Sequence, residues 1–124
     1  MIEVLGVINT QLAALGLNYE FGEMTQSPPV YPYWVGEYTE PAPNGEDGKQ
    51  EPVILLSGFT RGSHISLETQ AELIRNYYKH GITVLTDNGA AVIVNYAGSL
   101  QVPTNELELK KIQINLSIRL WNLA

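Results

Sequence analysis

The sequence predicts a single α+β domain, in which two helices pack on one side of an antiparallel or mixed β-sheet in the order α-β-β-β-α-β-β-β. A chain of 124 residues suits one domain with one hydrophobic core, here spanning 1–124. Two segments carry apolar residues at helical spacing, and most other apolar residues fall in the alternating or continuous runs typical of strands. Because strands follow one another before and after the second helix, the pattern favours an α+β fold over a doubly wound one.

The first predicted helix covers residues 4–15, whose apolar side chains recur every three or four positions, and Gly16 is placed to end it. Residues 18–24 alternate enough to form a strand, which the following Ser-Pro-Pro turn interrupts. A second strand is expected at 30–39, where aromatic residues are frequent. Pro32 weakens the beginning of that strand because proline cannot donate a ladder hydrogen bond.

A long loop is predicted at 40–52, because this segment has no large apolar residue and is dense in proline, glycine and acids. We expect it to be mobile in the free protein and to become ordered on binding. The continuous apolar run 53–56 follows, and Ser57 and Gly58 are expected to end it. Such a run predicts a central strand that is covered on both faces.

The second helix is predicted from Ser66, as its N-cap, to Gly81. The strands 82–85 and 91–96 flank Asp87-Asn88-Gly89, a sequence typical of a hairpin turn. The last strand alternates so regularly from Lys111 onward that one face should be apolar and the other neutral and polar. Apolar residues fall at odd-numbered positions before Lys110-Lys111 and at even-numbered positions after it. This change predicts a β-bulge there.

Composition excludes several classes of function. The net charge is −6 and there is no cysteine, so disulfides, thiolate metal sites and thiol nucleophiles are absent. An acidic chain without a dense Lys/Arg stripe is not expected to bind nucleic acid specifically. No segment has the pattern of a signal peptide or a membrane span, so the expected place of synthesis is a cytosol, without membrane contact.

No catalytic, cofactor-binding or metal-binding residue is predicted. The segment 58–64 is glycine-rich, carries Arg61, Ser63 and His64, and leads into a helix, so a small anion-binding enzyme is an alternative reading. It fits no known phosphate-binding motif, and glycine and serine are also common in ordinary turns. His64 and His80 lack the spacing of a metal site.

An interface for a partner is the stronger functional signal. Tyrosine and tryptophan combine a large apolar area with a polar tip and are enriched at protein interfaces, although a core and its rim would use the same residues. The neutral outer face of the last strand could also pack against another subunit without burying unpaired charge. The candidate interface residues are Tyr31, Tyr33, Trp34, Tyr38, Arg61 and Trp121.

The chain resembles the tail-completion or tail-terminator proteins of long-tailed bacteriophages, which join head and tail. The resemblance covers most of the chain and is carried by the order of elements, the opening helix at 2–15, the Pro-Tyr-Trp-Val stretch 32–35 and the closing strand. It implies a non-enzymatic structural protein of the virion, made in the host bacterial cytoplasm and without cofactors. Its implied partners are further copies of itself, the tail tube protein and head-side connector proteins. The copies would form a ring, for example a hexamer.

A head-completion or stopper protein of the connector is the alternative within the same class of function. It differs from a tail terminator in its partner and not in its physical chemistry.

Overall fold

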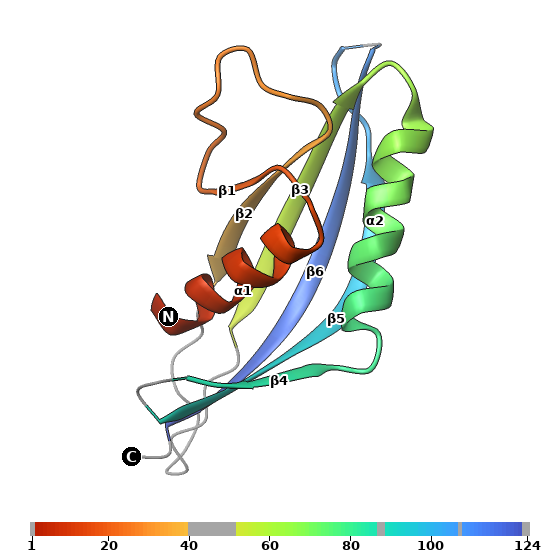
Figure 1. Ribbon diagram of the computed structural model, residues 1–124. Coiled ribbons are helices and arrows are strands. Elements are labelled where there is room, and N and C mark those ends of the chain that lie inside the picture. Colours follow the sequence, from red (N-terminus) through yellow and green to blue (C-terminus); the bar gives the residue numbers. More distant parts are fainter. Residues whose placement is uncertain (1, 40–51, 87–88, 107, 123–124) are drawn as a thin grey trace.

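The computed structural model describes residues 2–39, 52–86, 89–106 and 108–122, and it confirms the predicted α+β fold and element order. Both helices and all six strands belong to one sheet domain (Figure 1). The elements are α1 (Ile2–Ala14), β1 (Tyr19–Phe21), β2 (Tyr33–Thr39), β3 (Val53–Arg61), α2 (His64–Tyr78), β4 (Ile82–Leu85), β5 (Ala90–Val102) and β6 (Leu109–Asn122).

The sheet has the strand order β1-β2-β3-β6-β5-β4. β1 runs parallel to β2, and every other neighbouring pair is antiparallel. The last strand, β6, therefore lies in the middle of the sheet, where it pairs with β3 from Leu109 to Ser117 and with β5 from Lys111 to Asn122. β5 and β6 are the two longest strands of the sheet.

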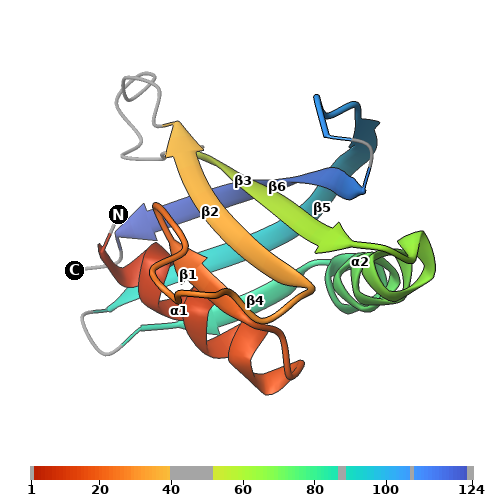
Figure 2. The same cartoon turned by 90° about the horizontal axis from the view of Figure 1, so that it is seen from above.

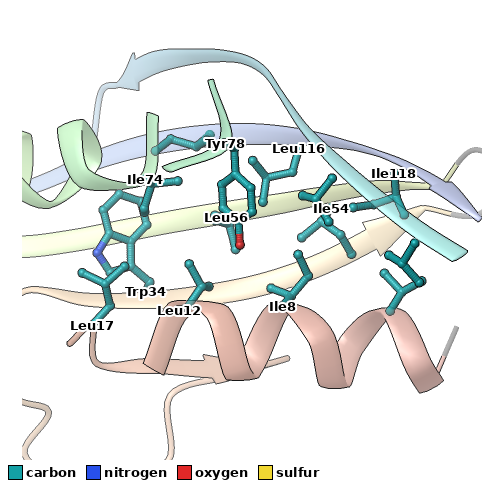
Figure 3. Close-up of a cluster of buried hydrophobic side chains, with 14 of the residues drawn as sticks. Ile8, Leu12, Leu17, Trp34, Ile54, Leu56, Ile74, Tyr78, Leu116 and Ile118 are labelled. Atoms are coloured by element: carbon teal, nitrogen blue, oxygen red, sulfur yellow. The ribbon is translucent and has the colours of Figure 1, made fainter. Parts of the chain in front are cut away.

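Both helices cover the same face of the sheet (Figure 2). Tyr78 reaches from α2 toward α1 within the core (Figure 3), and its hydroxyl donates a 2.8 Å hydrogen bond to Oε1 of Gln11. Trp34 of β2 is fully buried, and its indole N–H donates to Oε1 of Gln70 on α2 at 2.9 Å. These two bonds tie β2 and both helices together while satisfying buried polar groups. The largest fully buried apolar side chains are Val4, Ile8, Leu12, Trp34, Ile54, Leu56, Leu67, Ile74, Tyr78, Ile114, Leu116 and Ile118.

The prediction for 53–56 is wrong in two respects. The strand does not end at Gly58 but continues to Arg61, and only its even-numbered residues are covered by the helices. Gly58 is a strand residue because the Trp34 ring lies directly over it: a Cβ at Gly58 would come within 2.6 Å of the ring. The glycine marks a close approach and not a turn.

The predicted β-bulge at Lys110-Lys111 is also wrong. β6 pairs in unbroken register with β3 from Leu109 onward, and the irregularity lies in the neighbouring strand, between Tyr96 and Gly98 of β5. Leu109, the first residue of β6, therefore lies on the face of the sheet opposite to Ile112, and the change of parity needs no extra residue within the strand.

Smaller differences concern the ends of elements. The N-cap of α2 is Ser63, whose hydroxyl accepts from the backbone N–H of Ile65, rather than the predicted Ser66. β1 is shorter than the predicted strand 18–24, and β2 begins only after Pro32. Of the loop predicted at 40–52, residues 40–51 lie outside the described residues, as do 87–88 of the hairpin turn.

Two buried tyrosines give the fold a dependence on alkaline pH. Burial raises the pKa of Tyr19 from 10.0 to about 12, and burial also raises the pKa of Tyr78, with smaller effects from Tyr77 and Tyr19. A pKa that is higher in the folded state gives stability that is complete below the unfolded pKa and is lost as pH rises toward the folded pKa.

The free energy of unfolding is therefore expected to fall between pH 10 and pH 12, and to fall less in Tyr19→Phe than in the native chain. Urea denaturation at pH 8 and pH 11 measures this difference. Tyr38→Phe, at a tyrosine that is 40% exposed, is the control. An identical loss in the native chain and in Tyr19→Phe would contradict the assignment.

Candidate assembly interface

The face of the sheet opposite the helices has no covering layer among the described residues. We call it the open face. Strand pairing places side chains of β2, β3, β6 and β5 next to one another on it, and most of them are only partly exposed. Its residues include Tyr33, Val35, Glu37, Thr39, Val53, Leu55, Ser57, Phe59, Arg61, Ile93, Leu100, Val102, Leu109, Lys111, Gln113, Asn115, Ser117 and Arg119.

One end of the open face carries a row of aromatic and cationic side chains. Tyr33 stacks on Phe59 with ring centroids 5.2 Å apart, and Tyr31 lies against Tyr33 at 5.4 Å. Lys111, the partner of Phe59 in register, holds its ammonium 5.4 Å from the Phe59 ring centroid. The row crosses three strands, and such cross-strand aromatic pairs stabilise a sheet while offering a large apolar contact area.

Arg61 closes this row at the end of β3. Its Nε donates to the Tyr31 hydroxyl at 3.2 Å, and its guanidinium pairs with the Glu106 carboxylate at 2.7 Å. The hydrogen bonds to Tyr31 and Glu106 raise the pKa of Arg61, so it stays charged. Because both members of the ion pair are about half exposed, solvent screens it and the pair itself adds little to stability.

The middle of the open face is neutral and polar. Ser57 is 9% exposed, although no helix covers it, because its neighbours on the adjacent strands shield it. Asn115 has a side-chain oxygen that is buried and lacks a hydrogen-bond donor within the described part of the chain. Buried acceptors of this kind usually have partners, but this oxygen is itself covered from solvent, so it presents no open acceptor to another subunit.

The candidate interface residues of the sequence do not all lie together in the fold. Tyr31, Tyr33 and Arg61 come together at one end of the open face. Tyr38 lies on the other face of the sheet, where it stacks on Phe21 with centroids 5.8 Å apart. The backbone of Trp121 pairs with Ala91, and its side chain lies outside the described part of the structure.

Trp34 is a correction: it cannot belong to an exposed interface, because it is fully buried in the core. Its neighbour in sequence, Tyr33, is on the open face because side chains alternate between the two faces of a strand. The alternation in β2 was visible in the sequence, but the presence of Pro32 and of four aromatic residues obscured which ones face inward.

Phe59, Lys111 and Leu100 are interface candidates that the sequence reading missed. The sequence pattern puts Phe59 in a loop, whereas it lies in β3 with its side chain on the open face. Leu100 is 50% exposed, and it reaches the open face only because of the irregularity between Tyr96 and Gly98. The alternation of apolar and polar residues in β6 indicates that Lys111 is on the outer face. The same alternation, continued along β3 past Gly58, would place Phe59 on that face as well.

The segment 58–64 does not form the glycine-rich loop of the anion-binding alternative. Gly58 to Arg61 are in β3, Arg61 is paired with Glu106, and His64 opens α2 with its Nε2 in contact with the Gln101 amide. Among the described residues, no group of three or more His, Cys, Asp or Glu side chains is arranged to hold a metal ion. Neither α1 nor α2 is long and apolar enough to span a membrane.

Comparison with known proteins gives no relative: no protein-family model matches the chain, and no curated protein matches it.

Proposed function

We propose that this protein is a non-enzymatic assembly subunit of a bacteriophage virion, a tail terminator or tail-completion protein. In this role several copies form a ring, for example a hexamer. The ring caps the tail tube and joins it to head-side connector proteins. A head-completion or stopper protein of the connector remains the alternative within this proposal, because it would use the same kind of surface for a different partner.

The open face is the observation that supports self-assembly. A sheet normally buries its apolar side chains against another layer, and among the described residues no such layer lies over Val35, Leu55, Phe59 and Leu100. Partly apolar surfaces with aromatic residues and neutral polar groups are typical of the centres of protein interfaces. A second subunit would complete the fold by covering them.

The resemblance in sequence is what directs the proposal to the head-tail junction. It is carried by the opening helix, the 32–35 stretch and the closing strand, and the element order on which it also rests is the one found in the fold. The proposal adds that the copies contact one another through the open face.

Assembly of the purified chain tests the proposal. Native mass spectrometry and negative-stain microscopy over a range of concentrations should detect closed rings, either alone or after tail tubes are added, since ring contacts can need a partner to persist when dilute. Binding to the ends of tubes rather than to isolated connectors distinguishes the tail terminator from the stopper. A strict monomer that binds neither tubes nor connectors would contradict both roles.

A further inference from the structure

The outer side of α2 has an unusual composition for a surface helix. Its inner side buries Leu67, Ala71, Ile74 and Tyr78 in the core. Opposite this stripe lies Ile65, which is 76% exposed, and Leu73 on a neighbouring line of the helix is 43% exposed. An amphipathic helix that only faces solvent usually carries polar residues on that side. A shallow hollow of about 370 Å³ lies over the first two turns, lined by His64, Ile65, Glu68, Thr69 and Glu72.

Charge differs between this helix surface and the open face. On α2, Glu68 and Glu72 share Arg75, at 3.1 and 2.7 Å, so one carboxylate charge is left in excess over these turns, and Lys79 follows at the C-terminal end of the helix. On the open face, Lys111 and Arg119 outnumber the acid Glu37, while Arg61 is neutralised by Glu106. The two surfaces are therefore complementary in charge, which favours their contact and steers their approach.

Face-to-face pairing of two open faces is disfavoured by the same charges. It would bring Lys111 and Arg119 of both copies into one interface, and like charges across an interface are unfavourable. It would also leave Ile65 and Leu73 of α2 in water. A helix placed over the open face avoids both problems and gives each sheet a helical layer on both sides.

We infer that the outer side of α2 of one copy packs on the open face of the next copy. Ile65 and Leu73 then meet the apolar side chains around Leu55 and Phe59, and Glu68 and Glu72 approach the cations of the open face.

The contact is head-to-tail, because it joins two different surfaces on opposite sides of the subunit. Each added copy leaves one open face and one α2 surface free, so the contact repeats and closes into a ring when the rotation between copies allows it. This inference rests on the proposed self-assembly and names the two surfaces that perform it.

Disulfide trapping tests the pairing directly, since the chain has no cysteine of its own. The double variants combine Ile65→Cys with a cysteine at Gln113, Asn115 or Ser117, three positions along the middle of the open face. At least one of them is expected to give a ladder of covalent oligomers under mild oxidation. Each single variant should stay monomeric in denaturing gels, and Glu23→Cys with Gln113→Cys is the matched control.

Three results would overturn the inference. Cross-linking of a single open-face cysteine to itself would indicate face-to-face pairing. Absence of any ladder from all of the double variants, when the native chain does form rings, would mean that other surfaces make the ring, and the proposed function would stand. If the native chain forms no assembly even with tail tubes, the proposed function itself fails.

Charge reversal provides a second, independent readout. Lys111→Glu with Arg119→Glu, and separately Glu68→Lys with Glu72→Lys, should each raise the concentration needed for assembly at least tenfold, and combining all four should restore it. Glu23→Lys is the control, and circular dichroism checks that α2 is retained. Persistence of the defect in the fourfold variant would contradict direct contact between the two surfaces.

Single-stranded nucleic acid is the other occupant that a row of aromatic rings and cations could accept. The fluorescence anisotropy of a labelled single-stranded oligonucleotide should not change on titration with the native chain. Binding that Phe59→Glu abolishes would assign the open face to nucleic acid and overturn the inference.

Discussion

Replacing Gly58 by alanine is expected to lower the free energy of unfolding by about 2–4 kcal/mol. The new Cβ would lie 2.6 Å from the ring of Trp34, closer than any ordinary carbon contact. The ring cannot easily move away, because it is fully buried and its N–H is bonded to Gln70. Either β2 must shift from β3 or the bond to Gln70 must break.

The matched control is Gly6→Ala, which makes the same chemical change in α1. A Cβ at Gly6 meets no atom within 4 Å, and alanine is the better helix former, so this variant should gain about 0.5–1 kcal/mol. Urea denaturation of both variants measures the two effects. A loss at Gly58 below about 1 kcal/mol would mean that the contact between Trp34 and β3 is looser than described.

Phe59→Glu is expected to abolish assembly without unfolding the subunit. The substitution removes the ring that lies between Tyr33 and Lys111 and places a carboxylate where an apolar side chain of the neighbouring copy would pack. The fold should tolerate it, because Lys111 is the cross-strand partner and can pair with the new carboxylate. The concentration needed for assembly should rise at least tenfold, which corresponds to about 1.4 kcal/mol.

Val30→Glu is the control for added charge, since Val30 is 64% exposed and lies outside both proposed surfaces. Sedimentation velocity compares the two variants with the native chain, and circular dichroism confirms that each remains folded. If both variants assemble as the native chain does, the open face is an ordinary solvated surface.

The sequence was sufficient for the order of elements, because that depends on local patterns that survive in the fold. The helical stripe of Leu67, Ala71, Ile74 and Tyr78 and the alternation from Ile112 to Leu120 both faced the core as predicted. What the patterns could not supply was the identity of neighbours. The local pattern predicts that a strand ends at Gly58, since nothing in the neighbouring residues shows that Trp34 lies over it.

The candidate interface was predictable in part for the same reason. Tyr31, Tyr33 and Arg61 were identified by residue type, and the fold brings them together. Trp34 is also an aromatic residue of a type common at interfaces, but it lies on the opposite side of β2 from Tyr33. Only the pairing of β2 with β3 shows that this side faces the core. Lys111 and Phe59 are 52 residues apart in sequence numbering, so their contact depends on the strand order.

Imaging the assembled particle by cryo-electron microscopy tests the central claim most directly, namely that the open face is a contact between copies. The account predicts a closed ring in which the open face of every subunit, from Phe59 to Asn115, is covered by its neighbour. A ring whose subunits all leave this face in solvent would contradict it.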